Sequence, residues 1–370
     1  MTPLQKALAL LAGLTSLATL FVPYAMMQGQ PVPAWTFSPV AALAVVTIGI
    51  LLTFRNALRP VYCWAVALCA AIILLATLNR IDKAGPGFWL VLVSGWLMAW
   101  LFAERLADAI RSKQVSGRMF GFMIPLTFGL AILVIWEAVT RGGGVPTVLL
   151  PPPSSIWARI TASIPLLAAD FQQTFLKAVL IGYALGCGAG FLVAIAIDRS
   201  PFLKRGLLPL GSFVSALPMV GIAPIMVMWF GFDWPSKAAV VIIMTFFPML
   251  VNTVAGLNAS GSMERDMMRT YAAGYWQTLF KLRLPAAAPF IFNGLKINST
   301  LALIGAIVAE FFGTPIVGMG FRISTEVGKM NVDMVWAEIA MAALAGSLFY
   351  GIVALVERGV TFWHPSVRGG

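Results

Sequence analysis

The sequence predicts an all-α protein, a polytopic transmembrane helical bundle with about ten spans. Of its 370 residues, 60% are hydrophobic and 11% are charged, whereas a soluble domain carries about 25% charged residues. The mean hydropathy is +0.90. Apolar runs long enough to cross a hydrocarbon core of about 30 Å as helices recur along the whole chain. These runs are continuously apolar and do not alternate, so helices are favoured over the strands of a membrane barrel.

Ten apolar runs are candidate spans. The first begins after Lys6, as a signal peptide would, but no clear cleavage site follows it, and we expect a retained helix. The three cysteines lie inside apolar runs and are expected to pack there without forming disulfides. The predicted spans are residues 4–27, 38–54, 61–78, 87–103, 122–140, 174–197, 207–230, 238–257, 286–309 and 336–356.

The charged connection at 104–118 (ERLADAIRSKQVSGR) separates the first four predicted spans from the last six. It predicts an N-terminal extension, residues 1–115, with about four spans, and a second part, residues 116–370, with about six. The Gly- and Pro-rich segment 142–153 is expected at the membrane surface.

The basic residues predict the orientation of the chain. The net charge of +11 is spread over short gaps between apolar runs, a pattern that argues against a nucleic-acid surface. When the predicted spans cross the membrane in alternating directions, sixteen of the 25 Lys and Arg residues lie on one side of the membrane and eight on the other. Lys296 lies inside a span. Cytoplasmic loops carry the excess of such residues. Both termini are therefore expected in the cytoplasm.

One loop, residues 261–285, has a helical pattern of its own. Ser262 is expected to cap a first helix, Gly274 to end it, and Pro285 to open the next span, after a second helix at 275–282. Met267 and Tyr271 recur at helical spacing and form an apolar stripe. Periodicity alone leaves two readings open, a helix resting on lipid headgroups and a docking surface for a partner.

This loop resembles the signature cytoplasmic loop of ABC importer permeases, written E-A-A, three residues, G, nine residues, I-x-L-P. Aligning its end on Leu282 to Pro285 places Asp266 at the family's Glu, two Met at its two Ala, and Ala272 at its Gly. The resemblance implies that the loop couples the membrane helices to an ATPase. The residues implied in coupling are Asp266, Met267, Met268, Ala272, Gly274, Leu282, Leu284 and Pro285.

Flanking segments resemble the branch of that family that imports nitrate, sulfonates such as taurine, and pyrimidine precursors. They are residues 150–157, 215–231, 246–257, 290–297, 308–313 and 318–321. The resemblance implies a six-helix type I importer core, preceded here by four extra spans. It also implies ABC ATPase subunits, a second permease copy and a periplasmic solute-binding protein as partners, in the bacterial inner membrane among its lipids. The solute would be a small organic molecule or oxyanion, moved by alternating access.

The chain contains no G-x-x-x-x-G-K-[ST] sequence, so ATP is expected to bind to the separate ATPase subunit. This chain is expected to bind no cofactor. Its one histidine, His364, cannot form a multi-histidine metal site or, at the chain's end, a triad. No catalytic residue and no metal ligand is therefore expected. The alternatives are an ion-coupled secondary carrier, which would need acidic residues deep in the bundle, and a membrane scaffold or sensor.

Polar groups inside the spans are either solute contacts or bonds between helices. The candidates for a solute path are Asn252, Asn298, Thr300 and Glu310. Of the other carboxylates inside predicted spans, Glu137 is expected to extend to the membrane surface or to form a pair, with solute contact as the alternative, and Glu338 is expected to pair with Arg322 or Lys329.

Overall fold

The computed structural model describes residues 1–53, 58–114, 118–200, 202–207, 209, 218–313 and 317–363. The chain folds into two compact units, Met1–Trp157 and Ala158–Gly370. This division reflects packing alone, and the boundary of an N-terminal extension at 1–115 and a core at 116–370 stays a prediction. Within the described residues, seven helices are long and apolar enough to cross a membrane. The helical membrane bundle is thus confirmed, whereas the count of ten spans is not.

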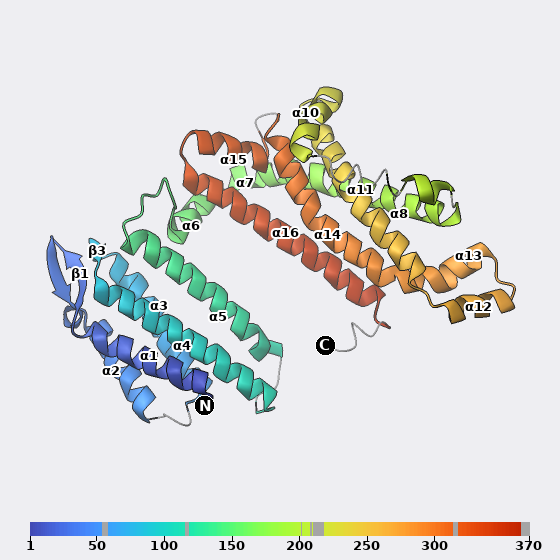
Figure 1. Cartoon of the computed structure of the whole chain (residues 1–370). Coiled ribbons are helices and arrows are strands. Elements are labelled where there is room, and N and C mark those ends of the chain that lie inside the picture. Colours follow the sequence, from blue (N-terminus) through green and yellow to red (C-terminus); the bar gives the residue numbers. More distant parts are fainter. Residues whose placement is uncertain are drawn as a thin grey trace. The chain divides into compact units, whose positions relative to one another are not determined.

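The first unit is built around α4 (Pro86–Arg111), which packs against α1 (Pro3–Thr19), α3 (Pro60–Leu78) and α5 (Arg118–Glu137). α2 (Ser38–Thr53) packs against α1 and α3. Figure 1 shows these helices in blue to green. α4 runs eight residues past the predicted end of its span, so the first half of the charged connection at 104–118 is helical.

A small antiparallel sheet replaces the end of the first predicted span. β1 (Pro23–Met27) lies between β2 (Gln30–Pro33) and β3 (Lys83–Ala84). The prediction of one helix over 4–27 is wrong in its last third, because α1 ends at Thr19 and Pro23 cannot continue an α-helix. Gln28 and Gly29 then form a two-residue turn in which both φ angles are positive, 51° and 75°.

Tyr24 fixes this sheet to the bundle. Its side chain is fully buried, and its hydroxyl lies 2.8 Å from Thr77 Oγ1 in α3. Burial raises the pKa of Tyr24 to about 12. The rings of Phe37 and Phe88 pack against it.

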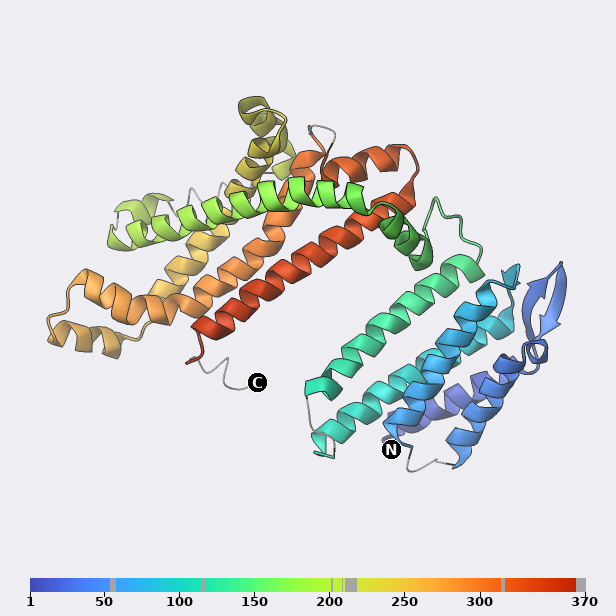
Figure 2. The same cartoon turned by 180° about the vertical axis from the view of Figure 1, so that it is seen from behind.

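The second unit centres on α11 (Trp234–Asn258), which packs along α14 (Leu284–Glu310) and α8 (Leu180–Arg199). α16 (Val332–Val360) packs on the other side of α14, so that α14 lies between α11 and α16 in both views (Figures 1 and 2). α7 (Ile164–Phe171) and the π-helical segment η3 (Gln172–Val179) lead into α8 as one unbroken run that starts ten residues before the predicted span at 174–197.

Two shorter helices, α10 and α15, also belong to this unit. α10 (Met219–Phe230) covers the second half of the predicted span at 207–230, and residues 208 and 210–217 lie outside the described residues. α15 (Met319–Gly328) packs against α14 and α16.

Glycines allow α8 to approach α11 closely. A Cβ at Gly182 would lie 2.6 Å from Val241 Cβ, and one at Gly190 would lie 2.5 Å from the Phe246 carbonyl oxygen. A Cβ at Gly186 would collide with Thr245 Oγ1. Small residues spaced four apart permit such close packing in membrane bundles.

Candidate functional site

The loop at 261–285, here called the projecting loop, extends from the ends of α11 and α14 (Figure 1). It consists of α12 (Ser262–Thr270), α13 (Tyr275–Thr278) and the π-helical segment η4 (Leu279–Arg283). Gly261, not Ser262, is the N-cap of α12, and Gly274 is the N-cap of α13 and does not end α12. The second helix expected at 275–282 has no end of its own, because α13, η4 and α14 form one helical run from Tyr275 to Glu310.

Ala272 makes the turn between α12 and α13. Its φ is +51°, in the left-handed region that costs a residue with a Cβ about 1–2 kcal/mol. This is the position that the family resemblance assigns to glycine, the residue that takes this conformation without strain.

Most of the apolar side chains of α12 and of the residue after it are exposed. Met263 is 82% exposed and Tyr271, just after the helix, is 79% exposed, with Met267 between them at 54%. No residue of α12 is buried. Asp266 is also exposed, paired with Arg269 at 3.4 Å, whereas Met268 is half-buried. An apolar patch of this kind on a projecting element marks an interaction site.

The base of the projecting loop is held by charged and apolar contacts. Arg283 donates two hydrogen bonds to the Asp198 carboxylate, at 2.6 and 2.7 Å, and a third to the Leu257 carbonyl oxygen at 3.0 Å. Leu279 is fully buried against Leu257 and Ala287. The predicted coupling residues at this base, Leu282, Leu284 and Pro285, are all half-buried.

Arg265 supplies the contact of α12 with the end of α11. Its guanidinium donates to the Asn258 carbonyl oxygen at 2.7 Å and to Ser260 Oγ at 2.8 Å. Sequence reasoning missed the roles of Asp198 and Arg283. The signal for Asp198 was available, since an acidic residue in the last turn of a helix opposes the helix dipole and needs a basic partner.

The other end of α14 carries a carboxylate cluster, formed by Asp170, Glu310 and Glu338 with Thr174 and Arg322. Asp170 is fully buried and accepts hydrogen bonds from the Gly318 amide at 2.6 Å and from Arg322 Nε at 2.8 Å. Its partners thus come from the start of α15 and the loop before it.

Glu310 is held in the same way. Its carboxylate accepts hydrogen bonds from Thr174 Oγ1 and from the Gly320 amide, both at 2.7 Å, and the residue is 2% exposed. The amides at the start of α15 therefore bind two carboxylates, which is where a helix favours negative charge.

Glu338 does not pair as predicted. Arg322 binds Asp170, and Lys329 binds Glu326 at 2.9 Å. Glu338 is fully buried, and neither of its carboxylate oxygens has a hydrogen-bond partner among the described residues. The prediction failed because Asp170, on α7, is far from this region in the sequence.

The start of α11 lies beside this cluster. Asp233 caps α11 by accepting from the Trp234 amide and from Gln173 Nε2, both at 2.7 Å. These two donors lower the pKa of the Asp233 carboxyl below its ordinary value. Lys237 is 1% exposed and donates to the Phe232 carbonyl oxygen at 2.7 Å.

The remaining candidates for a solute path differ in accessibility. Asn298 is fully buried and donates to the Thr245 carbonyl oxygen at 2.7 Å, which joins α14 to α11. Asn252 is half-buried, donates to the Pro248 carbonyl oxygen and accepts from Asn293 at 3.1 Å. Thr300 is exposed and bonds to the carbonyl of its own helix three residues earlier.

Glu137 forms a pair, which is one of the outcomes expected for it. Its carboxylate accepts from the Ser154 amide at 2.9 Å and from Arg141 at 3.1 Å, and Arg141 also donates to Asn79 at 2.6 Å. These contacts join α5 to α3 and to the start of α6 (Pro153–Ala162). A structural role is the simplest account of this carboxylate.

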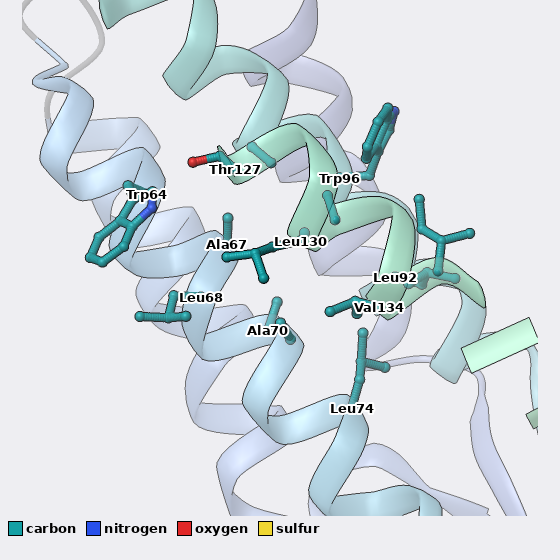
Figure 3. A pocket seen from close by; sticks show the side chains of 15 residues that line it. Trp64, Ala67, Leu68, Ala70, Leu74, Leu92, Trp96, Thr127, Leu130 and Val134 are labelled. Carbon is teal, nitrogen blue, oxygen red and sulfur yellow. The ribbon is translucent and has the colours of Figure 1, made fainter. Parts of the chain in front are cut away.

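A groove of about 90 Å³ lies between α3, α4 and α5 (Figure 3). Trp64, Trp96 and Thr127 line it together with aliphatic side chains such as Leu130. It contains no residue of the projecting loop or of the carboxylate cluster. Its walls are parts of predicted membrane spans, in which apolar side chains are expected.

Metal-ligating side chains do not gather in the part of the chain that the structure describes: no group of three or more His, Cys, Asp or Glu residues there has the geometry to hold an ion. His364 lies outside the described residues.

Comparison with known proteins identifies the family. Residues 182–362 match the family described as binding-protein-dependent transport system inner membrane component. The formylaminopyrimidine transport permease protein of Halalkalibacterium halodurans is 30% identical over 247 residues, which cover 67% of this chain and 98% of that protein.

Two further relatives agree. The putative aliphatic sulfonates transport permease protein of Bacillus subtilis is 29% identical over 265 residues, 71% of this chain and 95% of that one. The taurine transport system permease protein of Escherichia coli is 24% identical over 282 residues, 70% of this chain and 98% of that one. The chain therefore belongs to the binding-protein-dependent inner-membrane component family of ABC transporter permeases, as a transport subunit and not an enzyme.

Proposed function

We propose that this chain is the permease subunit of an ATP-driven importer that moves a small organic or oxyanion solute across the bacterial inner membrane by alternating access. The observation that carries this proposal is the exposed apolar side of α12, with Met263 and Met267 unpacked at the end of the membrane bundle. A partner that covers this surface would bury apolar area that the chain leaves in water.

The proposed partner at α12 is an ABC ATPase subunit, which would bind and hydrolyse the ATP. The loop would then lie in the cytoplasm, together with both termini. Asp266 and Arg269 would lie at the rim of the contact and the apolar side chains at its centre, while Leu282, Leu284 and Pro285 would join the contact to α14. A second permease copy and a solute-binding protein would complete the importer.

The relatives support the class of solute. Their names specify formylaminopyrimidine, aliphatic sulfonates and taurine, all of which are small and polar or charged. Among the four path candidates, Asn252 and Thr300 remain accessible and are our candidates for contact with solute. Asn298 and Glu310 are buried with partners on neighbouring elements, and we assign them to holding the helices together.

Copurification with the ATPase tests the proposal. We expect Ala272→Trp to reduce the amount of ATPase recovered with the detergent-solubilised chain by roughly tenfold or more, because the added indole would disrupt the contact beside its apolar centre. Asp266→Lys, which reverses a charge at the rim, should reduce the recovery less. Met330→Trp is a matched control, because Met330 is also exposed and has a positive φ, 58°, but lies at the end of α15. It should leave recovery unchanged.

Other outcomes would favour the other classes of protein. If the wild-type chain recovers no ATPase and supports uptake that follows an ion gradient, it is a secondary carrier. If it binds a partner through α12 without ATP-dependent uptake, it is a scaffold or sensor. Either result rejects the importer.

A further inference from the structure

Three helix ends meet at one arginine at the base of the projecting loop. We propose that Arg283 and Asp198 form a positioning clamp, which passes a displacement of the projecting loop to α8 and α11 together. This inference rests on the proposed function, because it assumes that the loop is moved by an ATPase.

The geometry of Arg283 suits a three-way joint. Two of its N–H groups bind the two oxygens of Asp198, in the last turn of α8, at 2.6 and 2.7 Å. Its Nε donates to the carbonyl oxygen of Leu257, in the last turn of α11, at 3.0 Å. A guanidinium holds its donors in one rigid plane, so these three bonds fix α8, α11 and the start of α14 relative to one another.

Asp198 is in an unfavourable place for α8 alone. A negative charge in the last turn of a helix lies next to the negative, carbonyl end of the helix dipole and therefore destabilises the helix. The Asp198 carboxylate gains its stability from other elements instead, since it also accepts from the Tyr275 hydroxyl at 3.0 Å. Its position is therefore explained by the contact with α13 and η4.

The clamp is shielded from solvent. The side chains of Arg283 and Asp198 are 13% and 10% exposed, so their attraction is screened less than that of a surface pair. Leu279, in the same π-helical segment as Arg283, is fully buried. Arg199 lies over the Tyr275 and Trp276 rings, at 5.4 and 5.8 Å from their centroids, and adds a second link between α8 and α13.

The two halves of the projecting loop are thus held differently. α12 has an exposed surface and a link to the end of α11 through Arg265. α13 and η4 are bound to α8 and α11 and run directly into α14. A push on α12 that reaches α13 would move the three helix ends as one body.

Hydrogen exchange measured by mass spectrometry on the purified permease–ATPase complex tests the clamp, with and without Mg-ATP and vanadate. In the wild type, the ATPase should protect 262–270, and nucleotide should change exchange at 190–199 and 250–258. In Arg283→Met, protection of 262–270 should persist while the nucleotide response at 190–199 falls about fivefold or more, the lower range of measured coupling between sites.

Arg283→Lys should restore part of the response, since an ammonium can reach Asp198 but cannot hold all three contacts. Lys281→Met is the control, because Lys281 is an exposed cation in the same turn. If Arg283→Met does not assemble, Asp198→Asn, which keeps an acceptor for Tyr275, carries the same test. A wild-type nucleotide response in the assembled variant would overturn the clamp. Absence of protection at 262–270 in the wild type would instead reject the proposed function.

Discussion

At one end of α14 the chain leaves Met263, Met267 and Tyr271 exposed, whereas at the other end it buries Asp170, Glu310 and Glu338. The apolar side chains of the first end make few contacts within the chain. The carboxylates Asp170 and Glu310 of the second end receive their hydrogen bonds from Thr174, Arg322 and the amides at the start of α15.

The difference shows which end needs another molecule. An exposed apolar helix is stabilised only when a partner covers it, so the projecting loop is incomplete by itself. A buried carboxylate is stabilised when hydrogen bonds satisfy it, as they do for Asp170 and Glu310, so these two members of the carboxylate cluster are structural elements of the chain. Substitutions should therefore affect stability at the cluster and partner binding at the loop.

The largest effect is expected for Arg322→Met. This change leaves the buried Asp170 carboxylate without its basic partner, which should cost about 3–5 kcal/mol of folding stability. Thermal unfolding in detergent can be followed with a thiol-reactive dye in a Cys69→Ala background, because Cys69 is exposed whereas Cys63 and Cys187 are buried. The control is Lys329→Met, whose ion pair is exposed on the lysine side and should cost about 0–1 kcal/mol. Equal costs for the two variants would show that the cluster is not a structural element.

Gly320→Ala should have the next largest effect. The added Cβ would collide with the Ile307 carbonyl oxygen and lie 2.9 Å from Glu310 Cβ, so α15 must shift, at a cost of about 1–3 kcal/mol. Gly328→Ala is the matched control on the same helix, since no atom lies within 4 Å of its added Cβ. The same dye assay applies, and a variant as stable as this control would mean that α15 can shift freely.

Ala272→Gly should stabilise the projecting loop by about 1 kcal/mol, because glycine takes the left-handed conformation at this turn without strain. Hydrogen exchange over 262–278 is the measurement, and slower exchange is the expected result. Ala273→Gly, where φ is not positive, should instead speed exchange. Faster exchange in both variants would contradict the strained turn.

The smallest change in stability is expected for the double variant Met263→Ser with Met267→Ser. Neither side chain is packed, so the change should stay within about 0.5 kcal/mol. Met319→Ser is the comparison at the other end of α14. Met319 is fully buried, so its replacement should lower the folding stability by about 2 kcal/mol or more. A large cost for the double variant would mean that α12 packs on its own chain.

Much of the fold was predictable because a membrane span is a constraint along the sequence. The predicted spans at 61–78, 238–257 and 286–309 lie within a few residues of α3, α11 and α14. The sheet was missed because the residues of β1 are apolar and extend the run of α1. Of the exposed apolar side chains of the projecting loop, Met267 and Tyr271 were predicted as a stripe from their helical spacing, whereas Met263 was not.

The contacts that hold both ends were not predictable, because they join distant parts of the chain. Arg322 and Asp170 are 152 residues apart, and Arg283 and Asp198 are 85 apart. A single sequence specifies that each charge needs a partner, but not which helix supplies it. This is why Glu338 was assigned to Arg322, which Asp170 binds instead.

Photo-crosslinking from α12 tests the central claim most directly. A photoreactive amino acid at Met267 should form a covalent product with an ABC ATPase in membranes that contain the assembled importer. The same group at Met330, which is 70% exposed at the end of α15, should not. Product from Met330 but not from Met267, or from neither position, would contradict the account.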